Sequence, residues 1–182
     1  MKINCKRNLK FVMLLLSSLL IASVSASVYY SLIMTSTISV ATNNVYFVLG
    51  ADNATAGVVL NSDNTTATLS SLKAYPNTTT TYSDPLRVRN NASSGSTNIR
   101  MRPISIVGGA TNLIFVNFTL IESGTLKTSL NYTSNGSVWT SPSTTGWVSI
   151  SANTEWNVTI ETKAIAGATS DSASVSISID VQ

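Results

Sequence analysis

The sequence predicts an all-β protein: a single jelly-roll-like β-sandwich of about nine to eleven strands that follows a cleaved signal peptide. Three observations lead to this prediction. An apolar run opens the chain behind a cluster of basic residues, short segments of alternating apolar and polar residues follow, and clusters of Gly, Asn, Ser and Thr separate them. Only 10% of the residues are charged, and Thr, Val and Ile are abundant, which favours strands over helices.

Residues 1–26 are the predicted signal peptide. Four basic residues precede an apolar run from Phe11 to Val24, and the small residues after it provide a cleavage zone. The run is about 14 residues long, whereas a membrane-spanning helix needs roughly 20. We therefore expect cleavage near Ser27 and no membrane span in the mature chain. The alternative is a pilin-type signal whose apolar stretch is kept as a helix, but a β-branched, Ser-rich sequence follows Ala26.

Removal of the signal peptide changes the charge of the chain. Four of the 11 basic residues leave with it, so seven remain against 8 acidic ones and the formal charge moves from +3 to −1. A nucleic-acid partner is therefore not expected. Cys5 is the only Cys, it lies in the signal peptide, and the chain has no His. A secreted chain without thiols points to an archaeal or bacterial surface protein.

Alternating apolar residues predict the strands. In chain order they cover 45–49, 58–60, 67–72, 86–88, 99–101, 114–120, 126–133, 147–150, 155–163 and 174–181. The inward faces are expected to hold Ile114, Val116, Phe118 and Leu120 in one strand, Leu126, Leu130 and Tyr132 in the next, and Val175, Ile177, Ile179 and Val181 in the last. No stretch of ten or more residues has a helical period, so no long helix is expected.

The most specific chemical signal is a set of N-glycosylation sequons. Asn-x-Ser/Thr occurs at Asn53, Asn64, Asn77, Asn91, Asn117, Asn131, Asn135 and Asn157. Some triplets are expected by chance in a chain this rich in Asn, Ser and Thr. The strand alternation, however, places Asn117, Asn131 and Asn157 on outward faces, where a glycan leaves the core undisturbed.

Catalytic sites are mostly excluded by composition. Without His or Cys in the mature chain there is no Ser-His-Asp triad, thiol nucleophile or common zinc site. The acidic residues are scattered singly: Asp52, Asp63, Asp84, Glu122, Glu155, Glu161, Asp171 and Asp180. Glu155 and Glu161 share an outward face and are interpreted as a solvated surface rather than a glycosidase pair. We expect no enzyme, no catalytic residue, no cofactor and no metal.

Three further groups of polar residues have weaker interpretations. Asp52, Asn53 and Asp63 offer oxygen ligands for calcium, but without an EF-hand spacing. The pairs Arg87 with Arg89 and Arg100 with Arg102 lie on adjacent predicted strands and suit either a patch for acidic groups or, as we favour, a solvated sheet face. An isopeptide cross-link from Lys73, Lys127 or Lys163 to an Asn has no support in the spacing.

A long alternating segment follows the cleavage site. Its apolar face consists of Val28, Tyr30, Leu32, Met34, Ile38 and Val40. It extends about 14 residues from Ser27, against ~5–6 for a usual strand. Ordering such a segment costs conformational entropy, which burial of its apolar side chains has to offset. We therefore expect the segment to join a sheet, either its own or a neighbour's.

The connection after this segment has two possible conformations. If Asn43 and Asn44 form a tight turn, the segment folds back as a hairpin onto residues 45–49, and the protein is a self-contained surface domain. If Thr42 to Asn44 are extended, they span about 10 Å and can deliver the strand into the next molecule. Such head-to-tail addition, repeated without closure, produces a filament.

The layout of the chain resembles a known family. A signal peptide, the alternating segment Ser27–Val40, the segment Val45–Gly50 and a sequon-rich sandwich with a serine-alternating last strand are similar to archaeal extracellular filament subunits. These are the bundling pili and threads, similar in turn to the TasA and camelysin biofilm-fibre proteins. The resemblance implies a jelly-roll subunit whose mature N-terminal strand completes its neighbour. The aromatic-Ser-Asp cluster of the bacterial members is replaced here by Tyr29–Leu32.

The sequence therefore predicts a signal peptide at 1–26, a donor strand at 27–42 and a β-sandwich domain at 43–182. The expected function is a secreted structural subunit of a filament, pilus or biofilm fibre, with copies of itself as partners and with other filaments or surface glycans as further ones. The alternative is a monomeric glycosylated surface or sugar-binding sandwich. Exposed aromatic side chains would favour sugar binding, and the candidates are Phe115, Trp139 and Trp147.

Overall fold

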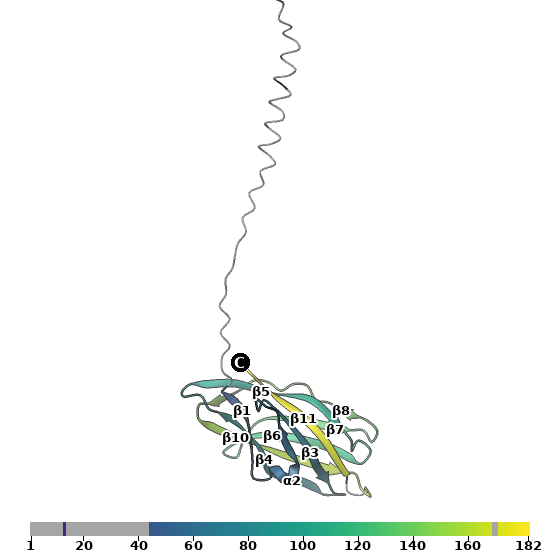
Figure 1. Cartoon of the computed structure of the whole chain (residues 1–182). Helices are drawn as coiled ribbons and strands as arrows, with labels where there is room; N and C mark the ends of the chain where they lie inside the picture. The colour runs from purple at the N-terminus through teal and green to yellow at the C-terminus, as the bar shows by residue number, and fades with distance from the viewer. Residues whose placement is uncertain (1–12, 14–43, 169–170) are drawn as a thin grey trace, which may run out of the picture. The chain divides into compact units, whose positions relative to one another are not determined.

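The computed structural model of the chain describes Met13, residues 44–168 and residues 171–182. The β-rich part belongs to a compact unit from Ala41 to Gln182. It consists of two antiparallel sheets packed face to face, so the predicted all-β sandwich is confirmed (Figure 1). Within the described residues, no helix has both the length and the apolar character that a membrane crossing requires.

The first sheet has six strands in the order β1-β4-β10-β6-β7-β8 and the second has five in the order β2-β3-β11-β5-β9. The first sheet holds β1 (Val45–Leu49), β4 (Thr79–Asn90), β10 (Thr154–Ala164), β6 (Leu113–Glu122), β7 (Thr125–Ser134) and β8 (Trp139–Thr140). The second holds β2 (Val58–Leu60), β3 (Thr66–Ala74), β11 (Asp171–Val181), β5 (Ser96–Val107) and β9 (Val148–Ser151). The chain crosses repeatedly from one sheet to the other, as in a jelly roll.

The core lies between the sheets and is built by the predicted alternation. Trp156, Val158 and Ile160 of β10 are buried, as are the inward residues of β6, β7 and β11. Phe118 and Tyr132 meet edge to face, with ring centroids 6.1 Å apart. Because successive side chains of a strand point to opposite faces, the period of two correctly assigned most inward positions.

Three inward predictions were wrong. Two of them fail at bulges. In β7, Leu126 pairs with Ile121 but Thr128 pairs with Leu120, so Lys127 is an extra residue and Leu126 turns outward, 61% exposed. In β6, Leu113 and Phe115 pair with the adjacent residues Ala164 and Lys163, so Ile114 is the extra residue and is 36% exposed. A bulge reverses the facing of the residues beyond it.

The third fails at a strand end, since Val181, the last residue of β11, is 38% exposed. The strand predicted at 147–150 begins one residue later, at Val148, and Trp147 is 41% exposed.

Several elements extend beyond the prediction. β4 and β5 have 12 residues each, whereas the pattern indicated only residues 86–88 and 99–101. The first half of β4 is rich in Thr and Ser and is followed by Pro85, so this part of the sequence lacks an apolar alternation. The two-residue β8 and the four-residue helix α2 (Asn53–Ala56) were also missed because they are too short to have a period.

Candidate functional site

The candidate site is a groove between β1 and β2, each of which is an edge strand of its sheet. β1 pairs on one side with β4, where Asn91 donates to the Asn44 carbonyl at 2.8 Å and Gly50 donates to the Pro85 carbonyl at 3.1 Å. Backbone groups alternate in direction along an antiparallel strand. Phe47 and Leu49 therefore direct their N–H and C=O groups away from β4.

The same alternation applies to β2. Ser70 donates to the Gly57 carbonyl and Asn61 donates to the Thr66 carbonyl, both at 3.1 Å, so these residues face β3. Val58 and Leu60 consequently direct their N–H and C=O groups away from β3, toward the open side. β2 thus directs these groups toward a strand placed beside it, whereas on β1 the Phe47 N–H already donates to the Asn64 carbonyl.

The groove between these edges has a volume of about 610 Å³. Its lining is apolar except for one Asn: Phe47, Val48, Leu49, Val58, Val59, Leu60 and Asn64. Val58 and Leu60 pack partly buried against the core, whereas Leu49 and Val59 are 46% and 63% exposed. The groove is therefore an opening at the side of the core that an apolar side chain can enter.

One end of the groove is closed by the turn between β2 and β3. Asn64 has a left-handed backbone (φ 57°), and its carbonyl accepts a 2.7 Å hydrogen bond from the N–H of Phe47. The turn is held by Asn61, whose side-chain oxygen accepts from the Thr66 N–H at 2.8 Å. Asp63 accepts from the N–H and hydroxyl of Thr65, at 3.2 and 2.7 Å, which lowers the pKa of that carboxyl group. Asn64 thereby links the edges of the two sheets.

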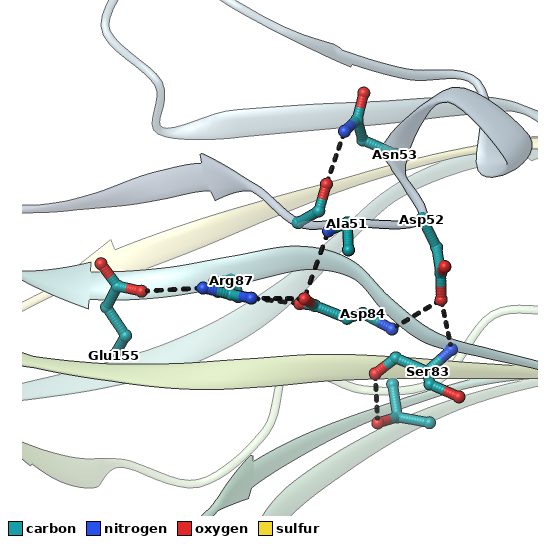
Figure 2. Close-up of polar contacts among 9 residues, drawn as sticks. Ala51, Asp52, Asn53, Ser83, Asp84, Arg87 and Glu155 are labelled. Carbon is teal, nitrogen blue, oxygen red and sulfur yellow. Dashed lines mark hydrogen bonds and ion pairs between the residues drawn. The ribbon is translucent and has the colours of Figure 1, made fainter.

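A polar network links the segment that follows Leu49 of β1 to β4 (Figure 2). β4 bulges where it passes from Leu86 to Tyr82, because Val158 and Ile160 of β10 pair with these two residues. Asp52 accepts hydrogen bonds from the N–H groups of Ser83 and Asp84 in this bulge, both at 3.0 Å. The Asp52 carboxylate thus accepts from two backbone N–H groups that the bulge takes out of the regular hydrogen-bond pattern of the sheet.

Asp84 is the centre of this network in Figure 2, between Ala51 on one side and Arg87 on the other. Its carboxylate accepts from the Ala51 N–H at 3.2 Å and from Arg87 Nε at 2.8 Å. The hydrogen bond from Arg87 keeps the pKa of Asp84 below its ordinary value, and the same pairing raises the pKa of Arg87. Arg87 also lies 3.4 Å from Glu155 on β10. These contacts tie the segment that connects β1 and β2 to the sheet.

The predicted glycosylation residues are spread over the domain. Asn117 on β6, Asn131 on β7 and Asn157 on β10 lie on the outer face of the six-stranded sheet, as the alternation predicted, and Asn117 and Asn131 are directly opposite each other. The other sequons are in helix α2 and in turns: Asn53, Asn64, Asn77, Asn91 and Asn135. Asn135 caps its own turn by accepting from the N–H groups of Ser137 and Val138, both at 3.0 Å.

The acidic candidates are engaged in local contacts. Asp52 and Asp63 accept from backbone N–H groups in two separate segments, and Asn53 donates to the Gly50 carbonyl. Glu155 pairs with Arg87 and Arg89, while Glu161 faces Asn117 at 3.5 Å. Among residues 44–168 and 171–182, no three Asp, Glu, His or Cys side chains gather closely enough to hold a metal ion.

The second arginine pair forms a cluster on the outer face of the five-stranded sheet. Arg100 and Arg102 donate to Asp180 at 3.0 and 2.9 Å, and the Arg100 guanidinium lies 4.5 Å from the ring centroid of Trp147. The two arginine pairs, predicted to lie on adjacent strands, are in different sheets.

Of the three aromatic candidates, Trp147 is exposed, whereas Phe115 and Trp139 are half-buried and Trp139 donates to the Gly108 carbonyl.

The three candidate lysines make no hydrogen bond to an Asn side chain in the described part of the chain. Lys127 instead lies 2.6 Å from Glu122 and 5.4 Å from the ring centroid of Trp156. The hydrogen bond from Lys127 lowers the pKa of Glu122.

The predicted polymerisation strand, from Val28 to Val40, lies outside the described residues. The groove itself was missed by the sequence reasoning, because a sequence does not reveal which strands end up at neighbouring sheet edges. The available signal was the pair of short, uncharged apolar strands 45–49 and 58–60. No protein-family model matches this chain, and no curated protein matches it significantly.

Proposed function

We propose that the protein is a structural subunit of an extracellular filament or biofilm matrix fibre that polymerises by donor-strand complementation. The segment from Ser27 to Val40 of one copy fills the groove between β1 and β2 of the next. The observation that carries this proposal is the apolar groove between two edge strands whose backbone groups point outward.

The donor segment and the groove have matching polarity. The segment has six apolar residues on one face at a period of two, and the groove offers the side chains of Leu49, Val58 and Leu60 to that face. A strand laid along β2 also meets the outward N–H and C=O groups of Val58 and Leu60. Backbone pairing then provides affinity, and the apolar contacts set the register.

The hydrogen bond between Asn64 and Phe47 favours exchange over an intramolecular hairpin. A segment that folds back onto β1 must pair with the groups that β1 directs away from β4. The central one, the N–H of Phe47, already donates to Asn64 at 2.7 Å. A hairpin along β1 has to break this bond, whereas a strand that enters along β2 leaves it intact.

The sequons support an extracellular role. Asn131 and Asn157 are exposed on the outer face of the six-stranded sheet, on the side of that sheet opposite to the core. Glycans there would be solvated and would leave the packing between the sheets unchanged.

The test is a pair of variants of the full-length secreted protein. Leu49→Lys places a charge in the groove, and Leu126→Lys places the same charge on another exposed Leu at the far side of the six-stranded sheet. We expect filaments in negative-stain micrographs of the wild type and of Leu126→Lys, and monomers for Leu49→Lys and for a deletion of Ser27–Thr42. Filaments formed by the deletion variant would refute the proposal.

A second candidate, a monomeric sugar-binding protein, is favoured by one observation. Trp147 is exposed next to the cluster of Arg100, Arg102 and Asp180, and an aromatic ring beside such groups suits a sugar. This function predicts that polysaccharide quenches tryptophan fluorescence and that Trp147→Ala removes the effect. Quenching by a wild type that forms no filaments would favour it over the filament proposal.

A further inference from the structure

We infer that a glycan on Asn64 and a strand in the groove exclude each other, so that modification of Asn64 holds the subunit in its monomeric form. This inference rests on the proposed function, because it concerns the same groove. Asn64 is the one polar residue in the groove lining and also the first residue of the sequon Asn64–Thr66.

The position of Asn64 is fixed by the turn around it. Its N–H donates to the Asn61 carbonyl at 3.1 Å, and its carbonyl holds the Phe47 N–H at 2.7 Å. The next residue is also held, since the Thr65 carbonyl accepts from Ile179 at 3.1 Å. The attachment point of a sugar on Asn64 therefore lies at the groove, and the hydrogen bonds of the turn prevent a backbone rotation that would move it elsewhere.

The other seven sequons do not share this position. Asn64 alone among the eight lines the groove. Asn117, Asn131 and Asn157 lie on the outer face of the six-stranded sheet, on β6, β7 and β10, whereas the groove lies at the β1 and β2 edges. A comparison of Asn64 with Asn157 can thus separate an effect of the groove from an effect of glycosylation in general.

A hydrated sugar and an apolar strand compete for the same space. A strand that fills the groove would trap the sugar against Leu60 and Val58, and its hydroxyl groups would lose water without gaining partners. The coupling is reciprocal, as linked binding requires. An inserted strand covers Asn64 and prevents its later modification, so the modification acts on the subunit before assembly.

The experiment compares glycan occupancy in two fractions. The full-length protein is secreted from a host that N-glycosylates, polymer and monomer are separated by centrifugation, and glycopeptides are quantified by mass spectrometry. We expect occupancy at Asn64 to be lower in the polymer by on the order of tenfold or more, within the usual range of coupling between sites. Occupancy at Asn157 should be equal in the two fractions.

Matched variants test the direction of the effect. Thr66→Val removes the Asn64 sequon with an isosteric side chain, and Thr159→Val does the same for Asn157. Thr66→Val should raise the polymer-to-monomer ratio, and Thr159→Val should not. Thermal unfolding of both variants checks that they fold, and the occupancy comparison in the wild type remains decisive if Thr66→Val does not.

The possible results separate this inference from the proposed function. Polymer that carries the Asn64 glycan as often as monomer does would overturn the exclusion and leave the filament intact. An Asn64 that is unmodified in both fractions would also overturn its regulatory role. If neither the wild type nor Thr66→Val forms polymer, the proposed function fails, and the exclusion fails with it.

Discussion

Replacement of Gly50 by Ala should destabilise the domain at the edge that forms the groove. An added Cβ would lie 2.1 Å from the backbone oxygen of Asp84 and 2.7 Å from its carbonyl carbon. Contacts this short cannot be relieved by rotating a side chain, so the backbone of β1 or of the β4 bulge has to move. The substitution therefore tests how closely these two segments are packed.

The magnitude follows from the contacts that such a movement disturbs. Overpacking of this kind costs about 1–3 kcal/mol. The shift also weakens the hydrogen bonds from Asp52 N–H to the Asp84 carbonyl, 2.8 Å, and from Ala51 N–H to the Asp84 carboxylate, 3.2 Å. Each is worth about 0.5–1.5 kcal/mol. We expect a loss of about 4 kcal/mol, or roughly 10–15 °C in Tm for a domain of this size.

The assay is urea unfolding of monomeric protein, followed by the fluorescence of the buried Trp156. Gly146→Ala is the matched control, because nothing lies within 4 Å of its added Cβ and its φ is not in the left-handed region. We expect the control to change stability by less than about 1 kcal/mol, with a small gain from reduced chain entropy. If Gly50→Ala unfolds within about 1 kcal/mol of Gly146→Ala, the close approach of Gly50 to Asp84 is refuted.

Three more predictions concern the core and the sequons. Asn90 is buried and links the two sheets, since its side chain donates to the Ile150 carbonyl at 3.0 Å and accepts from the Ala92 N–H at 3.0 Å. Asn90→Ala should lower the free energy of unfolding in urea by about 2–4 kcal/mol. The control, Asn98→Ala at an exposed position, should lower it by less than about 0.5 kcal/mol. Burial raises the pKa of Tyr132 to about 12, above its ordinary 10.0, so stability should be constant below pH 10 and fall by about 1.4 kcal/mol per pH unit between 10 and 12. Tyr132→Phe should remove this contribution to the alkaline loss, and an unchanged alkaline slope would contradict the assignment. The substitution should change stability at pH 7 by less than about 1 kcal/mol, because the hydroxyl has no hydrogen-bond partner among the described residues. Asn117 and Asn131 are directly opposite each other on neighbouring strands, with Cβ atoms about 4.5–5.5 Å apart, so two glycans would crowd each other there. Molecules with glycans on both residues should therefore be rare, and Asn131→Gln should raise glycan occupancy at Asn117. Frequent double occupancy in intact-mass spectra would argue against this crowding.

Much of the fold is predictable from the sequence because a strand with one buried face has a strict period of two. That period placed Phe118, Trp156 and Ile177 in the core. It failed at Leu126, since the bulge at Lys127 inserts one residue and leaves no mark in the pattern of apolar residues. It also failed over the first half of β4, where hydrogen bonding to β10 forms a strand from residues that carry little apolar signal.

The candidate site was harder to predict because its residues have ordinary local sequences. Asn64 reads as a turn residue and a sequon, and only the tertiary structure brings its carbonyl to Phe47. Asp52 and Asp84 read as scattered acids, and the bulge in β4 gives them their hydrogen bonds. Such roles depend on contacts between residues that are about 15–70 positions apart, which a periodicity argument does not reach.

The strand counts of the two sheets give the proposal a definite geometry. The first sheet has six strands and the second has five, and β1 and β2 are the edges that share the groove. Because the Phe47 N–H of β1 is bonded to Asn64, the free position for an added strand is the outer edge of β2. A donor strand there would give the second sheet six strands as well and would pair with the outward N–H and C=O groups of Val58 and Leu60. The donor should therefore protect the amides of Val58 and Leu60 from hydrogen exchange in the filament, more than those of Phe47 and Leu49.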